Sequence, residues 1–181
     1  MSTMNSWKGS KMATKWQRFS VEPPKDFTPA MRQQLGLEVA EFVRQRSESG
    51  LDKNNKAFPK YSKAYKESLD FNNAGKTSKV DLTLSGDMLI DLDILSNRSD
   101  KIVIGYEKGT EENSKADGNV RGTYGKSSPI PGKKRDFMGI TKTDYNNIVR
   151  GVRSRYGEDL EDGTDTVAAL ALARMLDRRK D

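Results

Sequence analysis

The sequence predicts an α+β fold, in which a small antiparallel β-sheet packs against an N-terminal helix and against a helix that follows a long loop. Two segments, residues 28–50 and 141–156, carry apolar residues at the spacing of one helix face. Between them, residues 92–106 contain two short apolar runs around a turn-forming sequence, which is typical of a β-hairpin. Helices and hairpin strands in this order favour a mixed fold.

The chain of 181 residues is long enough for one domain with an extension at each end. We expect a flexible or docking N-terminal arm over residues 1–27, the α+β domain over residues 28–162, and a C-terminal helix for subunit contact over residues 163–181. Only 34% of the residues are apolar, and the mean hydropathy is −0.83. We therefore expect contacts with neighbouring subunits to supply part of the stability.

The composition argues against several classes of protein. The chain has no cysteine and no histidine, which removes disulfides, thiolate metal sites and the commonest general base. We therefore expect no enzyme activity, no cofactor and no bound metal. No apolar run approaches the roughly 20 residues that a membrane helix needs, and residues 1–25 lack the apolar centre of a secretory signal. The expectation is a soluble protein made in a cytoplasm.

The expected N-terminal arm is basic and contains aromatic side chains. Residues 1–27 hold five lysine or arginine residues against two acidic ones, which gives +3 of the chain's net +6. Such an arm can contact DNA or an acidic partner, or it can be a solvated tail. The candidates for DNA contact here are Lys8, Lys11, Lys15 and Arg18. Its aromatic residues need an apolar surface, which we expect on a neighbouring subunit rather than on the same domain. These subunit-interface candidates are Trp7, Trp16 and Phe19.

The first helix is predicted to begin after Thr28, because a hydroxyl N-cap is followed there by Pro29 at the first helical position. It is expected to end near Gly50. Its apolar face consists of Met31, Leu35, Val39, Phe42 and Val43.

A short helix is expected over residues 61–69, followed by a loop over residues 71–79. The Gly-Lys-Thr in that loop lacks the first glycine of a phosphate-binding loop, and no apolar strand precedes it, so a nucleotide site is not expected. Ser85 is a candidate N-cap for a helical turn over residues 88–90.

The two hairpin strands are expected at residues 92–94 and 102–106, joined by a turn over residues 96–100. Residues 107–134 are polar and rich in glycine, and they are predicted to form the long loop. Loops of this length in compact domains usually serve a function.

The next helix is predicted to begin at Thr141, which forms a capping-box-like start with Asp144. Residues 157–163 are expected to break the chain before a last helix over residues 164–180. That helix is apolar on nearly every side, so another subunit is its natural cover. Its interface candidates are Leu170, Leu172, Met175 and Leu176.

Two charged clusters are candidate sites. The first is an acidic set, which could hold Mg²⁺, although alternation of acidic and apolar residues is also the solvated face of a strand. The set comprises Asp87, Asp91, Asp93 and Asp100. The second is the basic triplet Lys133–Arg135, in which Lys133 and Lys134 are candidates for DNA contact. Solvation, or pairing with acidic groups across an interface, is the alternative for the triplet.

The order of several short segments resembles the tailed-phage virion morphogenesis proteins, also called neck, head–tail joining or tail-completion proteins. The resemblance covers roughly residues 28–152. After the capped first helix, the segments read G-L-D-K-N-N-K-A-F-P-K-Y-S-K-A-Y, D-L-T-L-S-G-D-M-L, K-I-V-I-G-Y-E, K-A-D-G-N-V-R-G-T-Y-G and R-D-F-M-G-I-T-K-T-D-Y. Many members carry a His-x-x-Gly-like segment in the loop, whereas this chain has Gly118-Asn119 there.

The resemblance implies a ring-forming subunit of the virion, a hexamer or dodecamer at the head–tail junction, made in the host cytoplasm. The ring would join portal or connector proteins to tail proteins, in the neck or as a tail terminator, and DNA would pass through its channel without sequence readout. Gly86, Phe137 and Gly139 would be structural motif residues, with Phe137 anchoring the end of the loop in the core. Arg135 would be free to pair with a neighbouring subunit. The alternative function is a nucleic-acid-binding module that uses the basic arm and the Lys133–Arg135 patch.

Overall fold

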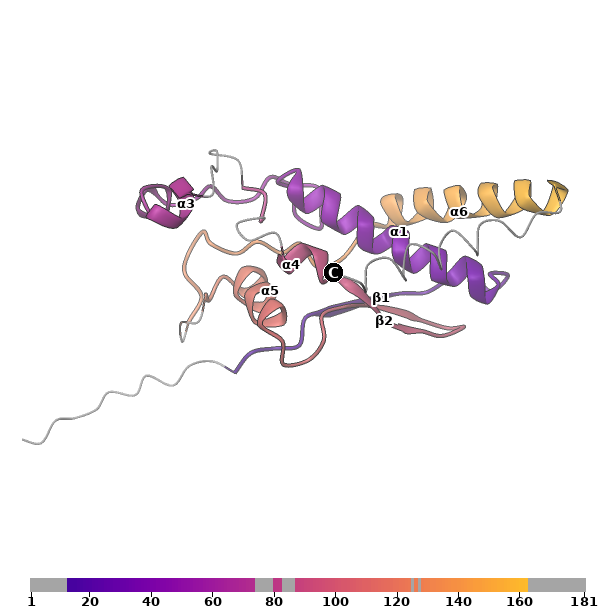
Figure 1. Ribbon diagram of the computed structural model, residues 1–181, viewed down its shortest axis with the longest axis horizontal. Helices are drawn as coiled ribbons and strands as arrows, with labels where there is room; N and C mark the ends of the chain where they lie inside the picture. The colour runs from indigo at the N-terminus through magenta and orange to yellow at the C-terminus, as the bar shows by residue number, and fades with distance from the viewer. Residues whose placement is uncertain (1–12, 74–79, 83–86, 125, 127, 163–181) are drawn as a thin grey trace, which may run out of the picture.

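The computed structural model has the α+β fold that the sequence predicts, and it describes residues 13–73, 80–82, 87–124, 126 and 128–162. In this part of the chain, a three-stranded antiparallel sheet of order β1-β3-β2 is accompanied by six helices (Figure 1). The strands are β1 (Arg18–Val21), β2 (Asp93–Asn97) and β3 (Ile102–Gly105). The helices are α1 (Pro29–Glu48), α2 (Lys63–Lys66), α3 (Leu69–Asn73), α4 (Asp87–Ile90), α5 (Glu111–Arg121) and α6 (Lys142–Asp162).

Several predicted site residues lie outside the described residues. They are Trp7, Lys8 and Lys11 of the arm, Gly86, and Leu170, Leu172, Met175 and Leu176 of the expected C-terminal helix.

Helix α1 covers the sheet, and α6 packs along α1. The sheet, α1 and α6 form three successive layers (Figure 1). Helix α1 is the middle layer, which contacts β2 and β3 on one side and α6 on another. The sequence predicted that α6 would pack on the sheet, but α1 already occupies that position, so α6 lies mainly against α1. The hydrophobic core joins all three layers through fully buried side chains such as Leu35, Ile104 and Val152.

Helix α1 begins and ends as its sequence predicts. The Thr28 side chain accepts a hydrogen bond from the Met31 amide at 3.2 Å, and Pro29 opens the helix. Leu35, Val39 and Val43 of the expected apolar face are completely buried. After the helix, Gly50 adopts a φ of 87°, a conformation that favours glycine.

The hairpin of β2 and β3 is also confirmed. Ile94 pairs with Ile104 and Asn97 with Ile102, and a bulge lies between Ile94 and Ser96. Ile102 and Ile104 are fully buried, as the apolar run of β3 indicates.

Strand β1 lies within the segment that was expected to be an arm. Arg18–Val21 pairs antiparallel with β3, with Arg18 opposite Gly105 and Val21 opposite Ile102. The sequence Arg-Phe-Ser-Val alternates polar and apolar residues, but a run of four residues is too short to indicate a strand by periodicity alone. Its pairing comes instead from β3, whose edge it covers.

The residues that precede β1 are bound to α5 by buried polar groups. The amide of Gln17 donates to Asn113 Oδ1 at 2.8 Å, and its side-chain Nε2 donates to Asp117 Oδ1 at 2.8 Å. Asn113 Nδ2 donates in turn to the carbonyl of Lys15 at 3.2 Å. Gln17, Asn113 and Asp117 are all buried, so this is an internal contact of the domain.

Helix α5 corrects the prediction that residues 107–134 form a loop. Thr110 caps the helix by accepting from the Asn113 amide at 3.1 Å, and Gly122 ends it with a φ of 71°. The sequence does not reveal this helix because its buried face is polar: Asn113 and Asp117 lie beside Ala116 and Gly118. A search for apolar periodicity cannot detect such a face.

Helix α6 begins as predicted and continues further than predicted. The Asp144 amide donates to Thr141 Oγ1 at 3.2 Å, which is the expected cap. The sequence placed a break at residues 157–163, whereas the helix extends to Asp162. Gly157 costs the helix about 1 kcal/mol relative to alanine, which a long helix tolerates.

Candidate functional site

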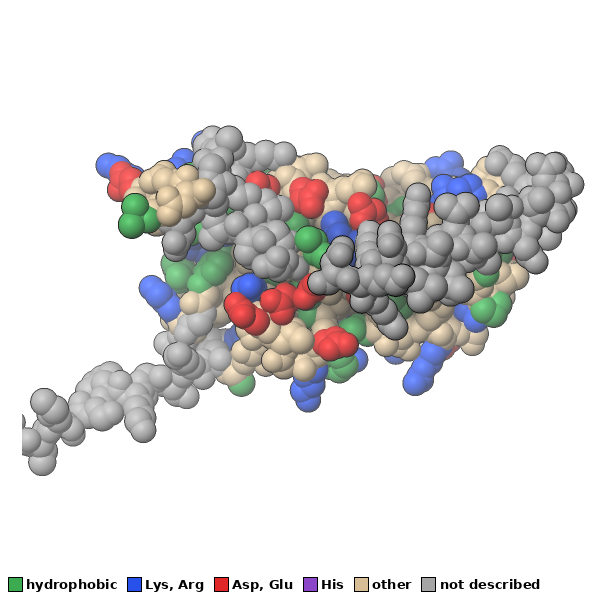
Figure 2. Space-filling view, in the orientation of Figure 1, with side chains coloured by type: hydrophobic (Ala, Val, Ile, Leu, Met, Phe, Trp, Pro, Cys, Tyr) green, Lys and Arg blue, Asp and Glu red, His purple; other side chains and the backbone are tan. Residues whose placement is uncertain are grey.

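The described surface contains a pocket of about 480 Å³. It lies between the α2 segment, α4, α5 and the chain that follows α5. Figure 2 shows hydrophobic side chains in the hollow below α3. The lining residues are Tyr61, Ser62, Tyr65, Leu82, Met88, Lys115, Asn119, Tyr124, Ile130, Lys133 and Arg135.

Arg135 is the central charged group of the pocket, and it is only 5% exposed. Its Nη1 donates to the Tyr124 hydroxyl, and its Nη2 lies 3.5 Å from the Pro59 carbonyl. The guanidinium carbon is 5.0 Å from the centre of the Tyr61 ring and 5.8 Å from that of Tyr124. Tyrosine rings at these distances stabilise a cation through their π electrons. The resemblance implied that Arg135 would be free to pair with a neighbour, but the structure places it inside the domain.

The cation has no described counter-ion. Among the residues that the structure describes, no carboxylate forms an ion pair with Arg135, and its Nε is buried without a hydrogen-bond partner. The adjacent Asp136 contacts lysines instead, at 3.0 Å from Lys53 Nζ and 3.5 Å from Lys134 Nζ.

Aromatic residues form one wall of the pocket. Tyr61, Tyr65 and Phe71 contact one another with ring centres 5.1 to 5.5 Å apart. Burial raises the pKa of Tyr61 and of Tyr124, and the nearby charge of Arg135 opposes the rise in both. Both hydroxyls therefore stay protonated over the physiological range.

Raising the pH above about 10 is expected to unfold the protein as tyrosines with raised folded-state pKa values ionise, of which Tyr106 is fully buried. Burial raises the folded-state pKa of four of them, listed here as Tyr61, Tyr106, Tyr124 and Tyr145. Because the folded state holds these protons more tightly, its stability is complete below the unfolded pKa and is lost as the pH rises toward the folded pKa values. Tyrosinate absorbance and circular dichroism should change in one transition. Complete ionisation near pH 10 with an unchanged dichroism spectrum would contradict this.

The segment from Arg135 to Gly139 connects the pocket to the core. Phe137 is completely buried, as the resemblance implies. Gly139 has a φ of 136°, which side-chain-bearing residues rarely adopt. Arg46 of α1 donates through Nη2 to the carbonyls of Phe137 at 2.7 Å and Gly139 at 2.8 Å.

Arg46 was missed from the sequence, although it lies one turn beyond Phe42 and Val43 on the apolar face of α1. A basic residue on such a face is the signal that could have identified it. Burial lowers its pKa, while the charges of Asp144, Asp52 and Asp136 act in the opposite direction.

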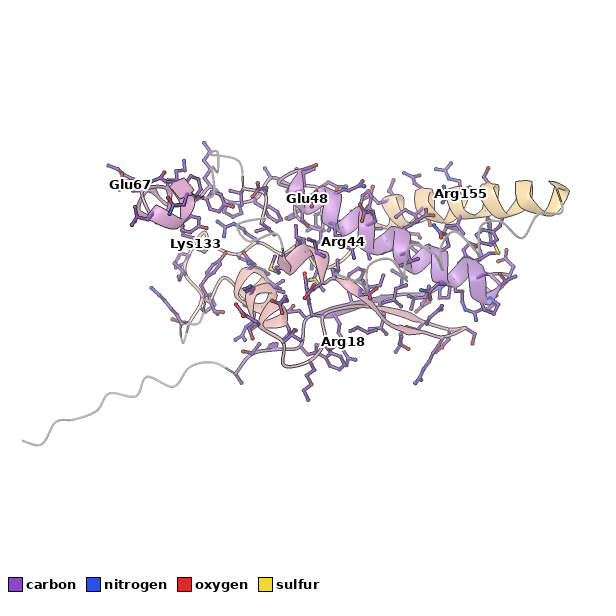
Figure 3. The ribbon with its side chains drawn as sticks, viewed as in Figure 1. Arg18, Arg44, Glu48, Glu67, Lys133 and Arg155 are labelled. Carbon is purple, nitrogen blue, oxygen red and sulfur yellow. The ribbon has the colours of Figure 1, made fainter. Side chains whose placement is uncertain are left out.

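The basic candidates within the described residues do not form one patch. Lys133 lines the pocket (Figure 3), Lys134 pairs with Asp136, and Arg135 is buried between rings. On β1, the Arg18 guanidinium lies 3.9 Å from the centre of the Trp16 ring. Lys15 is exposed.

The two aromatic candidates of the arm that the structure describes, Trp16 and Phe19, contact their own domain. Trp16 Nε1 donates to the carbonyl of Tyr106 at 2.6 Å, and Phe19 packs against the hydrophobic core. Trp16 remains 38% exposed.

The side chains of the acidic set that the structure describes are exposed and form no metal site. Asp91, Asp93 and Asp100 are exposed. Over the described residues, no group of three or more potential ligands is arranged to hold a metal ion. Within the same part of the chain, no helix combines the length and apolarity required to cross a membrane.

Comparisons with known proteins identify no relative of this chain. No family model, curated protein or solved structure matches the chain. The pocket itself has apolar and aromatic walls and cationic groups, which are suited to binding an anion.

Proposed function

We propose that the protein is a structural subunit of a tailed-phage virion, forming a ring in the neck or at the top of the tail. The ring connects portal-side and tail-side proteins and lets DNA pass through its channel. The observation that carries the proposal is the order of the family-like segments along an α+β domain. The domain supplies the elements that the resemblance implies, namely a capped first helix, a hairpin and a helix after the Arg135–Gly139 segment.

Two motif residues support the proposal by their positions. Phe137 is buried and Gly139 has a backbone conformation that favours glycine, which are the structural roles that the resemblance implies. These residues hold the end of the connection between α5 and α6 against α1. The rest of that connection can therefore extend away from the core, and the chain still returns to the core at a fixed position.

The charges of the domain agree with a channel that does not retain DNA. Tight binding to phosphates requires clustered, unpaired cations. Lys53 and Lys134 both pair with Asp136, Lys115 pairs with Glu111 at 3.1 Å, and Arg153 pairs with Asp26 at 2.9 Å. Basic groups that are dispersed and neutralised in this way would let DNA slide past.

Two exposed apolar side chains are candidates for contacts between subunits. Leu69 of α3 is 77% exposed and Ile90 of α4 is 66% exposed. A ring built by head-to-tail contacts needs two different complementary surfaces on each subunit. The segment over residues 163–181 supplies further apolar residues for such a contact.

The proposal is tested by producing the full chain alone and together with the proteins encoded by neighbouring genes. Light scattering and negative-stain electron microscopy should reveal a closed ring, free or on assembled particles. Deletion of residues 163–181 should abolish the ring while circular dichroism still shows a folded domain. Changing Ile90→Asp should weaken the ring, and Lys108→Ala, an exposed change outside these surfaces, should leave it intact.

A monomer that is absent from phage particles would refute the proposal. If that monomer bound duplex DNA with a salt-dependent affinity, and lost it when Lys8, Lys11, Lys15 and Arg18 were neutralised, the nucleic-acid-binding alternative would replace it.

A further inference from the structure

The pocket described above contains a cation that the domain only partly satisfies. A guanidinium has five N–H donors. Among the described residues, those of Arg135 find two acceptors, the Tyr124 hydroxyl and the Pro59 carbonyl. Removing a charge from water costs several kcal/mol unless an opposite charge or further hydrogen bonds compensate. The rings of Tyr61 and Tyr124 supply part of that compensation, but they supply no anion.

The other lining residues make the pocket selective for negative charge. Among the described residues, the lining includes Lys115 and Lys133 beside Arg135, and it includes no aspartate or glutamate. Asp81 is close enough to raise the pKa of Tyr61, yet it does not line the pocket. The ammonium of Lys115 also contacts Glu111 at 3.1 Å and Glu112 at 3.6 Å, so Lys133 and Arg135 are the groups left to face an anion.

The remaining walls are suited to an apolar body. Tyr61, Tyr65, Leu82, Met88 and Ile130 present rings and aliphatic chains to the pocket. A volume of about 480 Å³ falls within the range of small-ligand sites, roughly 300–1,000 Å³. Aromatic walls favour a planar ring, since ring pairs gain energy beyond the area that they bury.

We propose that this pocket binds an aromatic carboxylate, with the carboxylate at Arg135 and Lys133 and the ring among Tyr61, Tyr65 and Met88. A carboxylate matches the planar fork of an arginine, and it would complete the hydrogen bonding of the guanidinium. The same chemistry is available from a free aromatic acid or from neighbouring acidic and aromatic side chains of a protein segment. The proposal stands independently of the virion role, because it depends only on the lining of the pocket.

The test uses two probes of nearly equal shape, 3-phenylpropionate and its neutral amide, 3-phenylpropanamide. Each is titrated into the full chain and followed by amide chemical shifts. The acid should bind at least tenfold more tightly than the amide, with the largest shifts at Lys115, Asn119, Tyr124 and Lys133. Acetate, which has the charge without the ring, should bind at least tenfold more weakly than the acid. Equal affinity for acid and amide, or shifts away from the pocket, would overturn the proposal.

Matched variants locate the binding site. Lys133→Gln should lower the affinity for 3-phenylpropionate several-fold. Lys134→Gln changes the next residue, which lies outside the pocket, and it should leave that affinity unchanged. Arg135→Lys keeps the positive charge but removes the planar guanidinium. It should lower the affinity for the acid, relative to that for the amide, at least tenfold. Should that variant fail to fold, Ile130→Asp provides a second test, since a carboxylate in the wall should repel the acid and spare the amide. Unchanged affinity for the acid in both Lys133→Gln and Ile130→Asp would overturn the proposal.

A third probe distinguishes the source of the carboxylate. The peptide acetyl-Gly-Phe-Asp-Gly-amide carries the ring and the carboxylate on adjacent side chains. Binding at least as tight as that of 3-phenylpropionate would support a protein segment as the ligand. Binding of the free acid but not of the peptide would support a small molecule. If neither the free acid nor the peptide binds, the proposal that the pocket binds an aromatic carboxylate is refuted. That result would not bear on the proposed ring, which is tested separately.

Discussion

Replacing Phe137 with alanine is expected to lower the free energy of unfolding by about 3–5 kcal/mol. Phe137 is completely buried in the cluster that joins α1, the sheet and α6. Truncation removes the transfer free energy of the ring and leaves a cavity that the surrounding helices cannot fully close. The two carbonyls that Arg46 binds lie at Phe137 and Gly139, so the backbone there is held in place and cannot collapse into the space.

Urea unfolding followed by circular dichroism measures this effect, with an unchanged dependence on urea concentration expected if only stability changes. Lys108→Ala is the control, because Lys108 is exposed and lies outside the proposed subunit contacts, so its truncation should alter stability by no more than about 0.5 kcal/mol. A loss below about 1 kcal/mol for Phe137→Ala would show that the segment does not anchor the core.

Replacing Gly105 with alanine is expected to disrupt the pairing of β1 with β3 and to destabilise the protein by about 3 kcal/mol or more. A Cβ atom at this position would lie 2.6 Å from the carbonyl oxygen of Gln17 and 2.8 Å from Cα of Arg18. These are backbone atoms of the neighbouring strand and its extension, so no side-chain rotation can relieve the overlap. Movement of β1 would also break the hydrogen bonds of Gln17 with Asn113 and Asp117.

Amide hydrogen exchange in β1 and urea unfolding would measure the two consequences separately. Gly151→Ala in α6 is the matched control, since its new Cβ would meet nothing closer than the Arg155 side chain at 3.7 Å. Alanine is the better helix former by roughly 0.5–1 kcal/mol, so this change should leave stability equal or improve it. Normal exchange protection of β1 in Gly105→Ala would disprove the close approach.

The elements that could be predicted from sequence are those whose buried face is apolar. Helix α1, the hairpin of β2 and β3 and the start of α6 all carry an apolar repeat or a capping pattern. Helix α5 is bound through Asn113 and Asp117 to Gln17, which precedes β1, so the buried face of α5 shows no apolar repeat. This contact can be recognised only in the folded structure, because Gln17 and Asn113 lie 96 positions apart in the sequence. Strand β1 alternates polar and apolar residues, but over too few positions to indicate a strand.

The candidate site was foreseen only in part. Arg135 was selected as a functional residue, but a basic triplet in a polar stretch indicates a surface, and nothing local to it indicates burial. Its environment comes from Tyr61 and Pro59, more than seventy positions earlier in the chain, and from Tyr124. Phe137 and Gly139 could be predicted because their motif lies in one short stretch of sequence. Such a motif can be recognised without knowing which distant residues contact it.

The distance along the chain between β1 and its partners has a consequence for biosynthesis. The outer strand of the sheet has nothing to pair with until β3 and α5, which end at Gly105 and Arg121, have been made. At translation rates of roughly 5–20 residues per second, the amino end waits for several seconds. During that interval the β1 segment has no strand partner, so a ribosome-bound chaperone or another chain can bind the segment then.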